Sequence, residues 1–415
     1  MHLEIHGPSR LSGEIPVYGS KNAALPLLAA SLLTPETVVL TNMPKIRDVD
    51  SMNAILASLG AQVSHTGDVV RITASDIHSK SISVEAIGLL RGSILLFGAL
   101  LGRDKFVSLP LPGGDIIGAR PIDVHLDGFI QLGAQVTSDA DMVTVDGSSM
   151  KAGLVVLKEF SVTATENLLL ACATLPGTTT IHIAAAEPHV IALCQMLRGM
   201  GAEIVGEGTH TITITGTPQL GGVEFTNIPD MLEAGFFILL AAASKSELTV
   251  TGVPVQDLLL FFKRCDDIGI KYTISGDSVR VLPSTLSSFA IQALPYPGIA
   301  TDLQAPFAVI ATQAAGSSLI HDPMYEGRFK HVAELVKMGA NAVVCDPHRV
   351  IINGPTALVG RRIPSLDIRS GATLVMAGLI AQGTTIIDQA EIIERGYANL
   401  VDRLTAVGAS IAAHE

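Results

Sequence analysis

Six segments of the chain are apolar on nearly every side, and each is long enough for a helix but too short to span a bilayer. A β-branched stretch such as "TVVLTN" follows each segment, then a more amphipathic helix such as "RDVDSMNAILASLGA", then a further strand or two. The pattern predicts a repeated βαβαββ-like unit in which the first helix is buried. The six apolar segments read SKNAALPLLAASLL, RGSILLFGALLG, TENLLLACATL, MLEAGFFILLAAAS, LQAPFAVIATQAAG and SGATLVMAGLIAQG.

A short glycine phrase ends each amphipathic helix and marks the repeat. It reads LGAQV twice, then MGAEI, IGIKY, MGANA and VGASI, and its glycines are 73, 68, 68, 70 and 69 residues apart. Chance does not produce such a spacing six times. Six units of this length predict an α/β fold of two domains with three repeats each, with buried helices inside and sheets outside. The glycines are Gly60, Gly133, Gly201, Gly269, Gly339 and Gly408.

Composition narrows the class of protein. Among 415 residues, 48% are hydrophobic and 16% are charged. No apolar run is nevertheless long enough to span a bilayer. The opening "MHLEIHGPSR" lacks the apolar part of a secretory signal. We therefore expect a cytoplasmic protein without membrane insertion. The net charge of −12 argues against a nucleic-acid partner but allows an anionic small substrate where arginines converge.

Histidine and cysteine spacing predicts neither a metal nor a disulfide. The twelve histidines form no HxxxH or HExxH motif, so we expect no metal and no cofactor. The cysteines show no CxxC spacing and lie in apolar segments, which predicts core residues. They are Cys172, Cys194, Cys265 and Cys345.

Polar residues gather where the six apolar helices begin. Helix capping explains Ser20, Ser161 and Asp302. Capping does not explain Lys21, Arg91 and Arg369, because cations at a helix N-terminus oppose the helix dipole unless an anion lies there too. We therefore favour an anion-binding cleft. The polar residues at the six starts are Lys21 with Asn22, Arg91, Ser161 with Thr163, Asp230 with Glu233, Asp302, and Asp367 with Arg369.

The segment "LPLPGGDIIGARPIDVHL", residues 109–126, is predicted to be a loop. Its glycine pair before Asp115 is ordinary turn composition, and from the loop alone a solvated turn is the favoured interpretation. The alternative is a loop that closes over a ligand and carries a reactive residue.

Four segments in order are specific: "GSKNAALP", "PGGDIIGARPIDVHLDGFIQLGA", "ATDLQAPF" and "ERGYANL". Through them the chain resembles, over essentially its whole length, the UDP-N-acetylglucosamine 1-carboxyvinyltransferases, the enolpyruvyl transferases of peptidoglycan precursor synthesis. The resemblance implies a two-domain inverted α/β barrel fold. It places residues 21–228, with a catalytic loop around 111–120, in one domain, and 1–20 with 229–415 in the other. The active site is expected in the cleft between the domains.

The family transfers the enolpyruvyl group of phosphoenolpyruvate to the 3′-hydroxyl of UDP-N-acetylglucosamine and releases phosphate, through a tetrahedral ketal. This is the first committed step toward peptidoglycan, so the resemblance implies a role in cell wall biogenesis, cell shape and cell division.

By resemblance, Asp302 takes the proton of the attacking hydroxyl. Asp115 stands where most members have a cysteine that gives a proton to the methylene carbon of phosphoenolpyruvate, and loop closure would raise its pKa enough to donate. Phosphoenolpyruvate is expected to contact Lys21, Asn22, Arg120 and Arg395, with Lys21 and Arg395 also catalytic and Arg369 in support. The expected UDP-sugar contacts are Arg91, Arg120, Pro121, Ile122, Asp123, Val124, Glu159, Phe160, Ser161, Val162, Asp302, Met324 and Arg328.

Some positions depart from the family pattern and affect substrate affinity more than reaction type. Thr163 stands where glycine is common and is expected to crowd the nucleotide. The other departures are Met231 for arginine, Gly327 for asparagine, Glu394 for aspartate and Gly92 for alanine.

Three alternatives remain. The chain could be a 3-phosphoshikimate 1-carboxyvinyltransferase, although the motifs favour the UDP-sugar enzyme. It could bind a UDP-sugar without turnover, but such a paralogue should lose Lys21, Asp302 or Arg395, and all three are present. A purely structural repeat protein would not need cations at buried helix starts. The sequence leaves the oligomeric state open.

Overall fold

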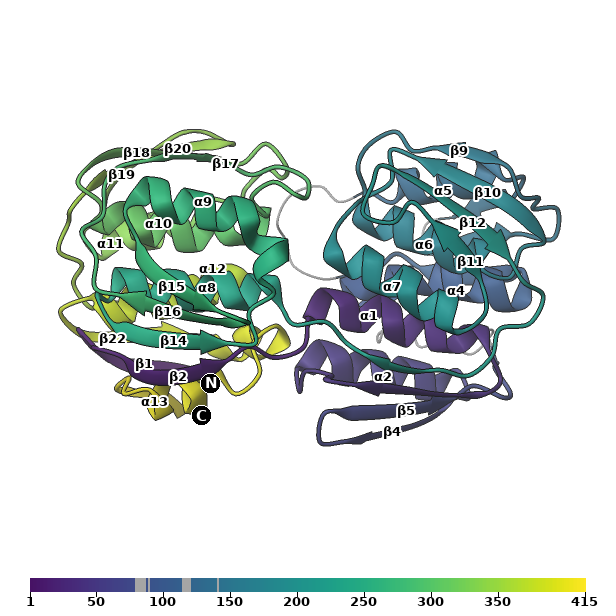
Figure 1. The fold of residues 1–415 in the computed structure, drawn as a ribbon, viewed down its shortest axis with the longest axis horizontal. Helices are drawn as coiled ribbons and strands as arrows, with labels where there is room; N and C mark the ends of the chain where they lie inside the picture. Colours follow the sequence, from purple (N-terminus) through teal and green to yellow (C-terminus); the bar gives the residue numbers. More distant parts are fainter. Residues whose placement is uncertain (79–86, 89, 114–120, 140–141) are drawn as a thin grey trace. The chain divides into compact units, whose positions relative to one another are not determined.

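The structure is a computed structural model that describes residues 1–78, 87–88, 90–113, 121–139 and 142–415. These residues form two compact units (Figure 1). Unit 1 contains residues 1–18 and 229–415, and unit 2 contains residues 19–113 and 121–228.

The six apolar segments form the central helices of the two units. In unit 1, α10 packs against α8 and α12, and in unit 2, α4 packs against α1 and α6 (Figure 1). Small residues allow close packing: a side chain at Gly98 of α4 would lie 2.2 Å from the backbone oxygen of Asn167 in α6. The prediction of buried helices is confirmed. Their bounds are α1 Lys21–Ala30, α4 Leu95–Asp104, α6 Val162–Cys172, α8 Met231–Ala243, α10 Gln304–Gln313 and α12 Ile368–Ile380.

A second, amphipathic set of helices ends at the six glycine phrases. Each phrase glycine has a positive φ, from +86° at Gly269 to +115° at Gly201, so the chain turns out of the helix through a left-handed residue. This conformation explains why the phrase repeats a glycine. The helices are α2 Arg47–Ser58, α5 Asp123–Gln131, α7 Pro188–Gly199, α9 Leu259–Ile268, α11 Lys330–Lys337 and α13 Leu400–Ala406. The short 3-10 helices are η1 Ser31–Leu33, η2 Arg91–Ile94, η3 Val255–Leu258, η4 Thr301–Leu303 and η5 Ala390–Arg395.

The described residues form five four-stranded sheets and one three-stranded sheet. Unit 1 holds the sheets β21 (Arg362–Pro364)–β22 (Gly383–Asp388)–β1 (His2–Gly7)–β23 (Ile411–His414), β15 (Lys271–Ser275)–β16 (Ser278–Leu282)–β14 (Glu247–Thr251)–β2 (Ser12–Pro16), and β17 (Ala290–Gln292)–β18 (Gly316–His321)–β20 (Arg349–Gly354)–β19 (Asn341–Asp346). Unit 2 holds β13 (Glu224–Thr226)–β3 (Thr37–Thr41)–β5 (Val69–Thr73)–β4 (Gln62–Thr66), β11 (Glu203–Val205)–β12 (Thr211–Gly216)–β10 (Gly177–His182)–β9 (Leu154–Val156), and β6 (Phe106–Pro110)–β8 (Met142–Asp146)–β7 (Gln135–Ser138).

Two strands lie in a different repeat from the helix that follows them. Strand β9 precedes α6 and pairs in parallel with β10, as the βαβαββ pattern predicts. Strand β2 precedes α1 of unit 2 but pairs in parallel with β14 of unit 1. Strand β13 precedes α8 of unit 1 but pairs with β3 of unit 2. At each passage between the units, the strand that precedes the passage therefore pairs within the unit that the chain is about to leave.

The termini complete one sheet. Strand β1 lies between β22 and β23 and pairs antiparallel with both, so the first strand of the chain completes the sheet of the sixth repeat. No helix within the described residues is long and apolar enough to cross a membrane.

One cysteine prediction is wrong. Cys172, Cys194 and Cys265 are buried as expected, but Cys345 is exposed. Cys345 lies near the end of β19, the edge strand of its sheet, and no residue of this strand is buried.

Candidate active site

Asp302 of unit 1 lies between two arginines. It belongs to η4, just before α10, and Arg328 donates from Nη2 to its Oδ1 over 2.8 Å while Arg369 donates from Nε to its Oδ2 over 3.0 Å. The side chains of Arg328 and Arg369 are 9% and 8% exposed, and that of Asp302 is 22% exposed. A carboxylate and two cations thus share one largely buried place.

The interpretation of Asp302 as a helix cap is wrong. The N-terminus of α10 has no side-chain cap, because both carboxylate oxygens of Asp302 are turned to the arginines. Asp367, in contrast, caps α12 by accepting from the backbone N–H groups of Arg369 and Ser370. The charge of Arg369, the second residue of α12, is therefore matched by Asp302, a carboxylate from another helix start.

The electrostatics of this cluster keep Asp302 ionised. Burial raises the pKa of a carboxyl group, but here the charges and hydrogen bonds of Arg328 and Arg369 outweigh burial and hold the pKa of Asp302 well below its usual range. Each arginine also keeps a buried donor atom, Nε of Arg328 and Nη1 of Arg369, for which the described part of the chain offers no hydrogen-bond partner.

Residues around the cluster fix its geometry. Thr301, next to Asp302, donates to Asp322 over 2.5 Å, and the backbone N–H of Met324 donates to the same carboxylate over 3.0 Å. The guanidinium of Arg369 lies 5.2 Å from the centre of the Tyr397 ring. Burial raises the pKa of Tyr397 to about 12, so its hydroxyl is neutral beside Arg369. Arg395 ends η5 two residues earlier and is half-buried.

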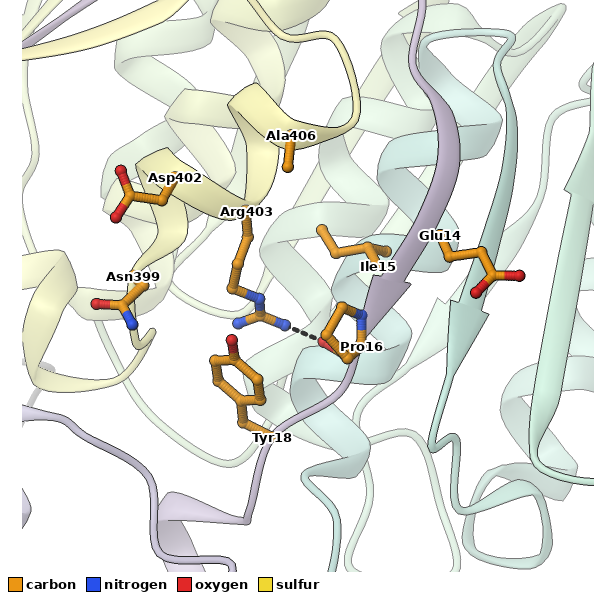
Figure 2. A pocket seen from close by; sticks show the side chains of 8 residues that line it. All are labelled: Glu14, Ile15, Pro16, Tyr18, Asn399, Asp402, Arg403 and Ala406. Carbon is orange, nitrogen blue, oxygen red and sulfur yellow. Dashed lines mark hydrogen bonds between the residues drawn. The ribbon is translucent and has the colours of Figure 1, made fainter. Parts of the chain in front are cut away.

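Glu233 of unit 1 belongs to a separate ion pair, which it forms with Arg403. Arg403 donates from Nη1 to Glu233 Oε1 over 2.6 Å and from Nη2 to Oε2 over 3.0 Å. It also donates to the carbonyl of Pro16 (Figure 2). Its guanidinium lies 4.0 Å from the centre of the Tyr18 ring. This pair secures the end of the first chain segment of unit 1. It lies beside a pocket of about 290 Å³ lined by Glu14, Ile15, Pro16, Tyr18, Asn399, Asp402, Arg403 and Ala406 (Figure 2).

In unit 2, Lys21 also has a carboxylate partner. Ser20 caps α1 by accepting from the N–H of Ala23 over 3.3 Å, as predicted, and Lys21 is the first residue of the helix. Its Nζ lies 2.8 Å from Oδ2 of Asp48, whose side chain is only 5% exposed. The chain therefore supplies an anion for the cation that begins α1. Asn22 follows in the first turn and is half-buried.

The other expected UDP-sugar contacts in unit 2 lie near the starts of α5 and α6. Ser161 caps α6 through Ala164 N–H, at 3.3 Å, and Val162 begins that helix. Glu159 and Phe160 precede it and are exposed. Ile122 and Val124 are buried, whereas Pro121 and Asp123 are exposed. Arg91 begins η2, and Asp115 and Arg120 lie outside the described residues.

Comparison with known proteins identifies the family. Residues 5–404 match the family model described as EPSP synthase (3-phosphoshikimate 1-carboxyvinyltransferase). The chain is 39% identical to the UDP-N-acetylglucosamine 1-carboxyvinyltransferase of Desulfosudis oleivorans, over 98% of both chains. It is 40% identical to UDP-N-acetylglucosamine 1-carboxyvinyltransferase 2 of Listeria monocytogenes, over 99% of this chain and 97% of that one. The chain belongs to the enolpyruvyl transferase family.

Solved structures agree with this family assignment. The enolpyruvyl transferase NikO from Streptomyces tendae matches with a TM-score of 0.90 and 26% identity, over 99% of this chain and 98% of that one. The EPSP synthase from Acinetobacter baumannii matches with a TM-score of 0.76 over the full length of both chains, and its 19% identity shows the fold alone. The predicted α/β fold is that of this family.

Several polar residues of the enolpyruvyl transferase escaped sequence reasoning. Asp48 stands in the first turn of α2 in the run "KIRDVD", where a helix-start acid is ordinary. His125 and Asn167 are buried and hydrogen-bonded to each other over 2.9 Å, although they lie 42 residues apart. Nothing in the sequence distinguishes Asp48 from an ordinary helix-start acid, and only the apolar run after Asn167 could have indicated the buried pair.

Proposed function

We propose that this chain is a UDP-N-acetylglucosamine 1-carboxyvinyltransferase, which transfers the enolpyruvyl group of phosphoenolpyruvate to the 3′-hydroxyl of UDP-N-acetylglucosamine and releases phosphate. The observation that carries the proposal is 39–40% identity, over nearly the whole chain, to relatives with that name. The cluster of Asp302, Arg328 and Arg369 supports it, because the chemistry needs a base and cations for an anionic substrate.

The addition step uses two acids of the chain. A proton passes from Asp115 to the methylene carbon of phosphoenolpyruvate, while the 3′-oxygen of the sugar bonds to the neighbouring carbon and its proton passes to Asp302. In the elimination step the new methyl group returns a proton to Asp115, the carbon–oxygen bond to phosphate breaks, and phosphate leaves with the electron pair and takes the proton held by Asp302. The product keeps the enolpyruvyl group as an ether, and both acids regain their starting protonation.

Asp302 must become more basic during this cycle. Two arginines hold its pKa low, and a carboxylate of low pKa is a weak general base. The buried donors of Arg328 and Arg369 that lack a partner within the described chain can bind the carboxylate or phosphate of phosphoenolpyruvate. In our proposal that anion shares the arginine charge, weakens its hold on Asp302 and raises the basicity of the carboxylate when both substrates are bound.

The other proposed contacts follow the resemblance. Lys21, Asn22, Arg120 and Arg395 hold phosphoenolpyruvate, and we assign the UDP-sugar to the region of Arg91, Arg120–Val124 and Glu159–Val162 together with Met324. The reaction belongs to peptidoglycan precursor synthesis. Phosphorylated substrates of this kind do not cross membranes unaided, so we place the reaction in the cytoplasm.

The test is phosphate release from the purified chain. We expect inorganic phosphate only when phosphoenolpyruvate and UDP-N-acetylglucosamine are present together, with each substrate alone as a control. Shikimate 3-phosphate should not replace the UDP-sugar. Release with shikimate 3-phosphate but not with the UDP-sugar would overturn the proposal in favour of the sister enzyme.

A further inference from the structure

The pocket of about 290 Å³ in unit 1 lies between helix α13 and strand β2 (Figure 2). Strand β2 pairs only with β14, so it is the edge strand of its sheet. Residues 14–16 of the strand line one side of the pocket. Asn399, Asp402, Arg403 and the small Ala406 line the other side. The pocket therefore adjoins the free edge of a strand, where backbone groups have no neighbouring strand to pair with.

Helix α13 closes this free edge at two points and leaves it open between them. The N–H of Ser12 donates to the carbonyl of Val407 over 2.9 Å, and the carbonyl of Pro16 accepts from Arg403. Alternate residues of a strand turn their backbone groups to the same edge, so Glu14, midway between Ser12 and Pro16, turns its N–H and C=O toward the helix as well. Within the part of the chain that the structure describes, neither group of Glu14 has a hydrogen-bond partner.

Arg403 adds a second unused donor to the wall of the pocket. It is 7% exposed, and its Nη1 and Nη2 donate to Glu233 and to the carbonyl of Pro16. Its buried Nε, in contrast, has no partner among the described residues. A carbonyl oxygen of a bound molecule has two lone pairs and is the kind of acceptor that such donors require. Because Glu233 balances the charge of Arg403, this arginine does not make the pocket cationic.

The unbalanced charges at the pocket are negative. Glu14 and Asp402 are exposed and line opposite sides of the pocket (Figure 2). Neither carboxylate forms an ion pair with any residue that the structure describes. Together with the unpaired carbonyl of Glu14, these groups accept hydrogen bonds and favour a cationic donor such as an ammonium group. They disfavour a carboxylate.

We propose that this pocket binds the N-terminus of another polypeptide, whose ammonium group donates to the carbonyl of Glu14 and whose first carbonyl accepts from the N–H of Glu14. Helix α13 closes the edge on both sides of Glu14, so the opening admits one residue and not a passing strand, which selects a chain end. The unpaired acids select the ammonium end over the carboxylate end. This binding is separate from the proposed transfer reaction and does not depend on it.

The experiment is a ligand-observed NMR titration of the unmodified chain with alanyl-alanine amide, which has a free ammonium group and no carboxylate. We expect a dissociation constant of about 1 mM, because the contacts are few. Acetyl-alanyl-alanine amide lacks the charge, ethylamine lacks the carbonyl, and free alanine adds a carboxylate. Each should bind at least about tenfold more weakly. Equal binding of any of the three would overturn the proposal, in favour of a neutral peptide, a simple ammonium site or a free amino acid, respectively.

Two variants assign the binding to this pocket. Ala406→Leu fills the pocket with another strong helix former and should abolish binding. Glu14→Gln should weaken binding about threefold, the usual scale for an exposed ion pair. The matched controls, which should bind normally, are Ala54→Leu on the exposed face of α2 and Glu203→Gln on the edge strand β11.

Thermal unfolding of Ala406→Leu checks that the variant is folded, and the series of probes tests the role of the ammonium group without any variant. Unchanged binding by a folded Ala406→Leu would place the peptide elsewhere and overturn the proposal. Absence of binding of alanyl-alanine amide to the unmodified chain at about 10 mM would overturn it as well.

Discussion

Arg369 donates from Nε to Oδ2 of Asp302 over 3.0 Å, although the two residues lie 67 positions apart and each stands near the start of a different buried helix. Arg328 holds the other carboxylate oxygen. A proposed general base is thus bound on both sides by cations before any substrate arrives. This arrangement makes the behaviour of Asp302 the most informative part of the candidate site.

Asp302→Asn should lower kcat by about 10²-fold or more, the usual scale for a general acid–base group, because the amide cannot take the proton of the attacking hydroxyl. The KM values should change less, since asparagine keeps the shape and one acceptor. Steady-state phosphate release measures both. Asp388→Asn removes a carboxylate paired with Arg362 on the surface and should leave the kinetics unchanged. A near-normal rate for Asp302→Asn would make Asp302 an anchor for the arginines only.

The ion pairs of Asp302 also predict a pH-dependent stability. Its pKa is depressed in the folded chain, so its contribution is fully present above the unfolded pKa of about 3.9 and is lost as pH falls through the lower folded value. The amide that replaces the carboxyl group in Asp302→Asn cannot ionise. The Tm of the unmodified chain should therefore exceed that of Asp302→Asn at pH 7, and the difference should shrink below about pH 4.

Differential scanning calorimetry between pH 3 and pH 7 measures this difference. Asp388→Asn serves again as the control, because its partner Arg362 is exposed and a surface ion pair contributes little. A difference in Tm between the unmodified chain and Asp302→Asn that grows toward acid pH has the wrong sign for a depressed carboxyl pKa and would contradict the account.

Lys21 has two roles that one double variant separates. Lys21→Ala should lower kcat/KM for phosphoenolpyruvate by at least about tenfold, through loss of a charge-assisted contact, and should also lower Tm because the buried Asp48 loses its ion pair with Lys21. Adding Asp48→Asn should recover much of the Tm but not the activity. Recovery of both would show that Lys21 serves only to neutralise Asp48.

Arg395→Ala extends the same test without this complication of Asp48. We expect a higher KM for phosphoenolpyruvate and a lower kcat. Unchanged kinetics in both Lys21→Ala and Arg395→Ala would remove the evidence for a cationic phosphoenolpyruvate site.

Because residue 115 is an aspartate, we predict that this chain is insensitive to fosfomycin. Fosfomycin is an epoxide that alkylates the cysteine found at this position in most of the family. A carboxylate is a much weaker nucleophile toward an epoxide than a thiolate. The unmodified chain should be active and resistant, Asp115→Cys should be active and inactivated over time, and Asp115→Asn should lose most turnover. Because Cys345 is exposed, Cys345→Ser is the control that assigns any labelling to the correct site. Irreversible inactivation of the unmodified chain, or full activity in Asp115→Asn, would return the loop to an ordinary turn.

The helices and repeats could be predicted because their information is local. An apolar helix such as α8, with twelve of its thirteen residues buried, indicates its burial within its own sequence. The left-handed glycines end their helices for an equally local reason. The local pattern alone does not predict the exchange of β2 and β13, because strand pairing depends on partners far away in the chain; only the family resemblance implied that residues 1–20 belong with 229–415.

The candidate site could be predicted only in part for the same reason. Residue types at helix starts indicated Asp302, Lys21 and Arg369, but not that Asp302 binds Arg369 or that Lys21 binds Asp48. Capping statistics favoured the wrong role for Asp302, because they describe an isolated helix and take no account of cations brought near by the fold. Cys345 was misplaced because an apolar edge strand has the same sequence pattern as a buried one.

The most direct test of enolpyruvyl transfer is the reaction in deuterium oxide with phosphoenolpyruvate labelled with carbon-13 at the methylene carbon. The account predicts a sugar nucleotide whose labelled vinylic carbon carries solvent deuterium, because addition delivers a deuteron to the methylene carbon and elimination can then remove any one of the three hydrogens of the methyl group. It also predicts loss of this product in Asp302→Asn. Phosphate release without a labelled sugar nucleotide, or labelled product made equally well by Asp302→Asn, would contradict it.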